Sequence, residues 1–107
     1  MESECVVVWT TLASTADSRQ LASILVTERL AACVNVLPEM ESVYRWKDEV
    51  EVDRERQVIM KTTAGRVPAL QARLHQLHGY DVPEFIVLPV IGGSDAYLSW
   101  IRESTAG

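Results

Sequence analysis

Hydrophobic residues follow two different periods along the first part of the chain. Residues 4–12 (ECVVVWTTL) are rich in β-branched and aromatic side chains, which predicts a strand, and the unbroken apolar run indicates that both faces of this strand are covered. Asp17 and Ser18 then supply helix-capping side chains. Apolar residues from Leu21 onward recur at helical spacing, so we expect a helix that continues to about Ala32.

The middle of the chain predicts a long hairpin. The pattern indicates a second strand at 33–37, a bulge or bend at Pro38, and a continuation of the strand through 42–46. The polar segment 47–49 is typical of a hairpin tip, and a third strand follows over 50–62. Both strands exceed the usual ~5–6 residues, so this hairpin should overhang a sheet of ordinary size. An overhanging, partly apolar strand needs cover from another chain, which favours oligomerisation through the strands.

The rest of the chain completes an alternating order of strands and helices. A second helix begins near Pro68, carries the cleanest apolar stripe, and ends at His78, with Gly79 expected in the left-handed conformation. Residues 84–91 predict a fourth strand and 96–104 a third helix. The order β-α-β-β-α-β-α predicts an α+β fold, the ferredoxin-like split βαβ arrangement with a C-terminal helix. In that fold an antiparallel sheet carries the first two helices on one face, and a partner subunit is the economical cover for apolar parts of the other.

Composition narrows the class of protein. A chain of 107 residues, 48% of them hydrophobic, predicts a single domain over 1–107 with its own core. The formal net charge of −5 argues against nucleic acid and against an anionic membrane surface as partners. No apolar run approaches the ~18–20 residues of a membrane span, and the first residues do not resemble a secretory signal. We therefore expect a cytoplasmic location.

Few side chains in this sequence suggest a metal site. The cysteines, Cys5 and Cys33, match no metal or redox motif and are expected to be structural thiols. His75 and His78 lie three residues apart on one helix face and could chelate a metal with oxygen ligands from the residues that follow, such as Glu84. The alternative is a solvated helix end, where the carbonyl groups favour a protonated histidine.

Aromatic residues suggest a pocket or an interface. Tyr44, Trp46, Tyr80 and Trp100 are amphipathic side chains that either line a pocket or pack between subunits. Lys61 follows an apolar strand and is either a charge at the rim of a cleft or a strand-end lysine that reaches solvent. Spacing alone does not decide between these interpretations.

Five phrases together resemble one protein family. They are ERLAACVNV (28–36), SVYRWKDEVE (42–51), IMKTT (59–63), HGYDVPE (78–84) and YLSWI (97–101). In this order and with these gaps, they are similar to the CutA divalent-cation-tolerance family over nearly the whole chain. The resemblance implies a tight homotrimer assembled through the long β-strands, with a fold similar to PII-type signalling proteins and clefts between neighbouring subunits.

The resemblance also implies a function and a set of residues. It implies binding of a divalent metal such as Cu(II), or of a small ligand, at the clefts in a response to metal ions, and it implies no enzymatic reaction. The positions that the resemblance places in the cleft are Cys33, Tyr44, Trp46, Lys61, Tyr80 and Trp100. His78 and Glu84, which flank a tight turn, are the expected metal contacts.

This chain departs from the family at its proposed copper site. The cysteine of that site corresponds to Thr10, the first residue of its His-His pair corresponds to Leu77, and the usual proline corresponds to Gly79. Of those copper ligands only His78 remains, and the soft thiolate that would favour Cu(I) is missing.

Three other functions remain open at this stage. A PII-like signalling or adaptor module would bind a small anionic metabolite, with Lys61 as its counter-charge, or a protein partner. An enzyme would build an acid–base site from His78, Tyr80 and Glu84. The trimer could also act as a rigid scaffold for other proteins.

Overall fold

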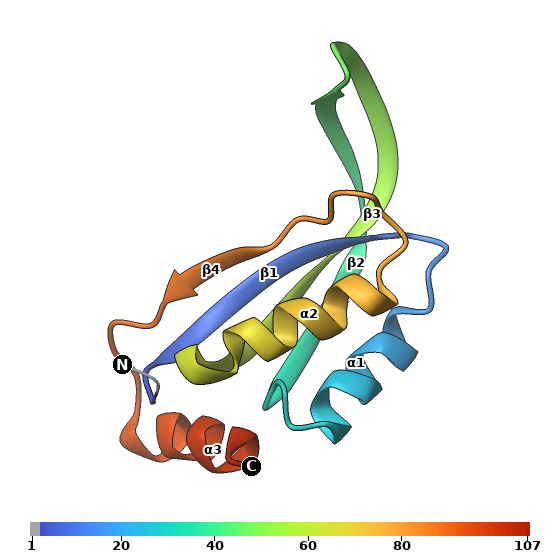
Figure 1. Ribbon diagram of the computed structural model, residues 1–107. Coiled ribbons are helices and arrows are strands. Elements are labelled where there is room, and N and C mark those ends of the chain that lie inside the picture. The colour runs from blue at the N-terminus through green and yellow to red at the C-terminus, as the bar shows by residue number, and fades with distance from the viewer. Residues whose placement is uncertain (1–2) are drawn as a thin grey trace.

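The computed structural model describes residues 3–107 and follows the predicted order of elements. The helices and strands are β1 (Cys5–Ala13), α1 (Ser18–Thr27), β2 (Cys33–Trp46), β3 (Glu49–Thr63), α2 (Val67–Leu77), β4 (Ile86–Pro89) and α3 (Asp95–Thr105), with a 3-10 turn at Ala64–Arg66 before α2. One antiparallel sheet has the strand order β2-β3-β1-β4. In Figure 1, α1 and α2 lie over one face of this sheet, and α3 lies beyond one end of the strands. The mixed α+β fold is therefore confirmed.

The core lies between the sheet and the two covering helices. Alternate positions of β1 and β3, including Val8, Val58 and Met60, are fully buried against Leu25 of α1 and Leu70 of α2. Each such side chain contributes about 1.5–3 kcal/mol by leaving water. The period-two pattern of the strands and the helical stripes therefore meet as the sequence predicts.

The first helix is shorter than its apolar pattern predicts. We expected it to continue to Ala32, but α1 ends at Thr27, and Arg29 takes a left-handed conformation with φ 61°. The N–H groups of Leu30 and Ala31 then turn back onto the Leu25 carbonyl, at 3.0 and 3.3 Å. Leu30 and Ala31 are buried although they follow the turn, so burial rather than helix continuation explains the apolar pattern there.

Two predictions about the second half of the chain need correction. Gly79 is not left-handed, since no glycine of residues 3–107 has a positive φ. Helix α2 ends at Leu77, and the following residue, His78, already has an extended backbone (φ −84°, ψ 144°). The fourth strand covers only Ile86–Pro89 instead of 84–91, because it pairs with β1 only opposite Val6 to Trp9. The segment before β4 instead contacts β3, through hydrogen bonds of Tyr80 with Glu55 and of Glu84 with Gln57.

The hairpin extends beyond the rest of the sheet, as predicted. A register shift between Val36 and Glu39 confirms the irregularity at Pro38, and positive φ angles at Lys47 and Asp48 form the tip. The ladder between β1 and β3 stops at Ala13 and Glu55, and one further backbone hydrogen bond joins the Ser14 N–H to the Arg54 carbonyl at 3.1 Å. Residues 41–54, here called the arm, therefore have their ladder partners within the hairpin. The arm projects from the molecule, which measures 44 × 26 × 24 Å (Figure 1).

Candidate functional site

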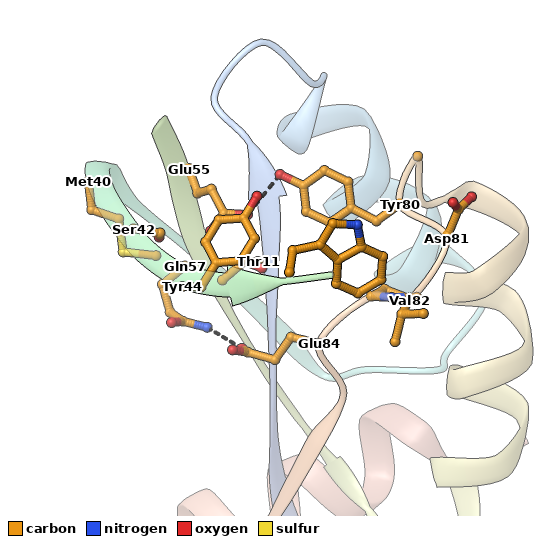
Figure 2. Close-up of a pocket in the computed structure, with 13 residues that line it drawn as sticks. Thr11, Met40, Ser42, Tyr44, Glu55, Gln57, Tyr80, Asp81, Val82 and Glu84 are labelled. Carbon is orange, nitrogen blue, oxygen red and sulfur yellow. Dashed lines mark hydrogen bonds between the residues drawn. The ribbon is translucent and has the colours of Figure 1, made fainter. Parts of the chain in front are cut away.

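A cleft of about 670 Å³ lies where the arm leaves the sheet. Its strand residues alternate with the core positions of β2 and β3, so they face away from the positions that α1 and α2 cover. The segment 79–84, between α2 and β4, supplies the opposite wall. Figure 2 shows side chains from both walls directed toward the space between them. The sequence alternation of the arm and the short β4 together create this cleft.

Aromatic rings and carboxylates dominate the lining of the cleft. Tyr44 and Trp46 come from β2, and Tyr80 comes from the opposite wall. The acidic lining residues are Glu55, Asp81 and Glu84. Among residues 3–107, no lysine or arginine lines the cleft. The negative charge of the lining therefore has no counter-charge within the wall, and the cleft favours positively charged ligands.

Both tyrosines of the cleft donate hydrogen bonds to carboxylates. The Tyr80 hydroxyl donates to Glu55 Oε2 at 2.7 Å (Figure 2), and the Tyr44 hydroxyl donates to Asp53 on the neighbouring strand. The hydrogen bond to Asp53 raises the pKa of Tyr44 to about 12. Burial and then the hydrogen bond to Glu55 raise the pKa of Tyr80 well above its usual range. Both phenols therefore stay neutral at physiological pH, and the negative charge of the cleft belongs to the carboxylates.

Gln57 fixes the position of Glu84. Its side-chain amide donates to the Thr10 carbonyl at 2.8 Å. The same amide donates to Glu84 Oε2 at 2.9 Å, as Figure 2 shows. One amide group thus links β1, β3 and the opposite wall, and it holds the Glu84 carboxylate in the cleft. The other lone pairs of that carboxylate remain available to a cation.

Both ring nitrogens of His78 are engaged within the chain. Nδ1 accepts the Tyr80 N–H at 3.1 Å, so the proton lies on Nε2, which donates to the Thr11 carbonyl at 2.6 Å. The ring also contacts the Tyr80 ring, with centroids 4.8 Å apart. In this arrangement His78 holds the start of the opposite wall against β1, and a metal would have to displace one of these hydrogen bonds. Within residues 3–107, no group of three or more His, Cys, Asp or Glu side chains is arranged to hold a metal ion.

The residues expected in one cleft divide into two clusters. Tyr44, Trp46 and Tyr80 line the cleft described above, together with Glu84. The others lie near α3, where Lys61 Nζ is 3.3 Å from the Tyr97 hydroxyl and 5.6 Å from the centre of that ring. Trp100 contacts Tyr97 with ring centroids 5.3 Å apart, and Cys33 is the cross-strand partner of Lys61. Among the described residues of one chain, the four residues of this second cluster do not line the first cleft.

Comparison with known proteins assigns the chain to a family. The family model described as CutA1 divalent ion tolerance protein matches residues 6–104. The divalent-cation tolerance protein CutA of Thermus thermophilus is 46% identical over 99 residues, which cover 92% of this chain and 96% of that protein. The chain belongs to the CutA1 divalent ion tolerance family.

Solved CutA1 structures confirm the fold. The CutA1 structure from Thermus thermophilus has a TM-score of 0.91 at 45% identity and covers 95% of this chain and 99% of its own. The CutA1 structure from a psychrotrophic Shewanella has a TM-score of 0.92 at 32% identity and covers both chains fully, at 100%. The human protein CutA is 42% identical over 88 residues, but this chain spans only 49% of its length.

The CutA1 family name describes tolerance to divalent cations and names no reaction. It links the chain to divalent cations without specifying the ion. Relatives include a chloroplastic protein of Arabidopsis thaliana and a structure described as periplasmic from Archaeoglobus fulgidus, so the cytoplasmic location stays a prediction. Within residues 3–107, no helix is long and apolar enough to cross a membrane.

Among the functional residues of this CutA1 cleft, sequence reasoning missed Glu55 and Gln57. Glu55 pairs with Ala13 on one side and Met40 on the other, and it is only 7% exposed. In the sequence it belongs to a run of charged residues that is typical of a solvated strand. The alternation of polar residues along β3 indicates on which face of the strand Glu55 lies. The segment that buries Glu55, however, is distant in the sequence.

Proposed function

We propose that residues 1–107 form one domain of a homotrimer that binds a divalent cation in the arm cleft and acts in tolerance of divalent metal ions. The observation that carries the proposal is a cleft lined by Glu55, Asp81 and Glu84 without a lysine or arginine among the described residues. We assign no catalytic reaction to this site.

The exposed apolar face of the arm supports assembly. Val43, Val50 and Val52 are 64%, 65% and 58% exposed in the single chain. They continue the strand positions that α1 and α2 cover farther along the sheet, so in a trimer the neighbouring subunits would replace those helices.

Glu84 is the proposed primary ligand for the cation, and His78 is its proposed partner. The Glu84 carboxylate is held in place by Gln57 and lines the cleft. Carboxylate oxygens suit hard divalent ions, whereas Cu(II) also favours an imidazole nitrogen. For that reason a copper site requires His78 to release the Tyr80 N–H, and copper is the ion that most directly tests the role of His78.

Calorimetric titration with Cu(II), Zn(II) and Mn(II) in a non-chelating buffer tests this proposal. We expect saturable binding that Glu84→Gln weakens at least about tenfold, because a charge-assisted contact is worth roughly 1.5–3 kcal/mol. His78→Ala should weaken Cu(II) more than Mn(II). Glu103→Gln, an exposed carboxylate on α3, is the matched control and should bind as the wild type does. Equal binding by all variants would contradict a metal site in this cleft.

The cleft does not favour an anionic metabolite. Its lining is acidic, and Lys61, the counter-charge expected for such a ligand, lies in the separate cluster beside Tyr97. A PII-like role therefore has no support from the charge of this site.

A further inference from the structure

Three large aromatic side chains are left half-exposed around one space. Tyr44, Trp46 and Tyr80 are 39%, 41% and 36% exposed, and all of them line the arm cleft. They come from two separate segments of the chain, and none belongs to the hydrophobic core. Two of the rings have a neighbour in the chain, because Lys47 Nζ lies 6.0 Å from the centre of the Trp46 ring and the Tyr80 ring contacts His78. The exposed parts of the three rings line the cleft, where they are available to a ligand.

Glu55 places a buried negative charge beside these rings. Glu55 is only 7% exposed, and its carboxylate accepts a hydrogen bond from the neutral Tyr80 hydroxyl. The ion pairs found among residues 3–107 join Arg54 to Glu39 and Arg73 to Glu28, so they do not include Glu55. A buried carboxylate without a cationic partner is costly, and a positive ligand would relieve that cost.

The hydroxyl protons of both tyrosines are already used in hydrogen bonds within the chain, so they are not available to a ligand. The hydroxyl groups donate to Asp53 and Glu55, which leaves the rings neutral and fixes their orientation. A phenol that donates to a carboxylate holds more electron density in its ring, and this strengthens the attraction of the ring for a cation.

The volume of the cleft matches an organic molecule. At about 670 Å³ it lies within the range of roughly 300–1,000 Å³ that is typical of small-molecule sites. A bare metal ion would occupy a small part of this space and would leave the apolar ring faces without contact. The ring faces and the buried carboxylate are together suited to a cation that carries alkyl groups.

The geometry points to the arm cleft as a binding site for a small organic ammonium ion, with the ammonium group near Glu55 and the alkyl part over Trp46, Tyr44 and Tyr80. This site goes beyond the proposed metal function and does not depend on it. Both proposals use the acidic lining of the cleft, but the metal proposal is tested at Glu84 and His78, whereas the ammonium site is tested at Trp46 and Glu55.

Ligand-detected saturation-transfer NMR with n-butylammonium chloride tests this site. The neutral molecule n-butanol is the matched ligand control, and sodium chloride keeps the ionic strength constant. We expect saturable binding of butylammonium with a dissociation constant on the order of 1–10 mM, and binding of butanol at least about tenfold weaker.

Two variants and two controls locate the ligand. Trp46→Leu removes the π-face but keeps an apolar side chain, and Glu55→Gln removes the charge but keeps an acceptor for Tyr80. Each should weaken butylammonium binding at least about fivefold. Trp100→Leu and Glu103→Gln change equivalent residues outside the cleft and should bind as the wild type does. Circular dichroism and light scattering establish that each variant keeps its fold and assembly.

Several outcomes would overturn the proposal. These are absence of binding by the wild type, equal binding of butanol, and equal weakening by the control variants. Retention of wild-type affinity by both Trp46→Leu and Glu55→Gln would do so as well. The metal titrations of Glu84→Gln and His78→Ala succeed or fail separately, because neither variant removes the ring face or the buried charge that this test measures.

Discussion

Thr10 contains a fully buried hydroxyl group that has no hydrogen-bond partner among residues 3–107. A buried polar atom without a partner costs about 1–3 kcal/mol. We expect Thr10→Val, which keeps the shape but removes the hydroxyl, to raise the free energy of unfolding by about 1–2 kcal/mol. Denaturant unfolding at a fixed protein concentration measures this change, because assembly shifts apparent stability.

Thr62 is the matched control for Thr10. It is also fully buried, but its hydroxyl donates to the Leu30 carbonyl at 2.8 Å. Thr62→Val should therefore lower the free energy of unfolding by about 1 kcal/mol or more. If both substitutions were destabilising to the same degree, the Thr10 hydroxyl would have a partner and our interpretation would be wrong.

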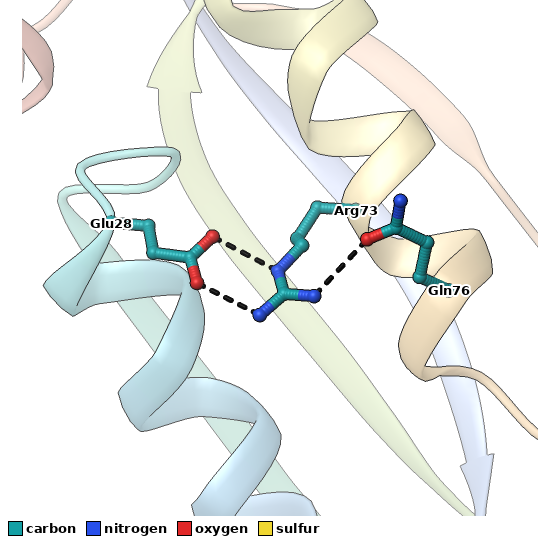
Figure 3. Close-up of polar contacts among 3 residues, drawn as sticks. All are labelled: Glu28, Arg73 and Gln76. Carbon is teal, nitrogen blue, oxygen red and sulfur yellow. Dashed lines mark hydrogen bonds and ion pairs between the residues drawn. The ribbon is translucent and has the colours of Figure 1, made fainter.

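At the scale of elements, an ion pair connects the two covering helices. Arg73 of α2 donates to both carboxylate oxygens of Glu28, at 2.9 Å each, and to Gln76 Oε1 at 3.1 Å (Figure 3). Glu28 caps the C-terminal end of α1, where the helix dipole disfavours a negative charge. Arg73 therefore compensates for an unfavourable position as well as joining the helices.

The contribution of this pair to stability should be small. Its side chains are 33% and 41% exposed, so solvent screens the attraction. A double-mutant cycle with Glu28→Gln and Arg73→Gln should give a coupling energy of about 0.2–1 kcal/mol that decreases in 1 M salt. Unfolding measurements at low and high salt provide the test. A coupling above about 2 kcal/mol, or one insensitive to salt, would contradict it.

The elements were predictable from the sequence where their patterns are local. Strand alternation, helical stripes and the break at Pro38 each depend on neighbouring residues, and the structure has all of them. The end of α1 was not predictable from its apolar pattern, because Leu30 and Ala31 are buried by a turn that returns to Leu25. An apolar residue reports burial, and helix continuation is only one way to achieve it.

The cleft was predictable only in part, because its geometry depends on register and distance. The aromatic residues were identified from their type. Glu55 and Gln57 acquire their roles from the segment 79–84. This segment is too far away in the sequence for a local pattern to reveal the contact. Conversely, Lys61 and Trp100 resemble cleft residues in type but lie in the cluster near α3. Only the fold separates these two sets.

At the scale of the whole molecule, the arm extends the core pattern beyond the core. Val43 pairs with Val52 across the arm, and Val50 lies two residues away on the same face. This face continues the strand positions of Val58 and Met60, which α1 and α2 bury completely. Since no helix of the described chain covers the arm, we expect its apolar face to pack on another copy, and the proposed closed trimer would supply that surface to every arm.

A single charge on this face should therefore disrupt assembly. The wild type should have three times the 12.0 kDa chain mass in multi-angle light scattering, and Val52→Asp should shift it toward one chain mass. Burial of an unpaired carboxylate costs more than about 3 kcal/mol at each interface, which weakens assembly more than about 100-fold. Ala72→Asp places the same charge on an exposed position of α2 and should remain trimeric. A wild type that is monomeric at all concentrations would refute the trimer. A trimeric Val52→Asp variant would place the interface elsewhere, because a buried charge on the arm face is incompatible with the packing proposed for it.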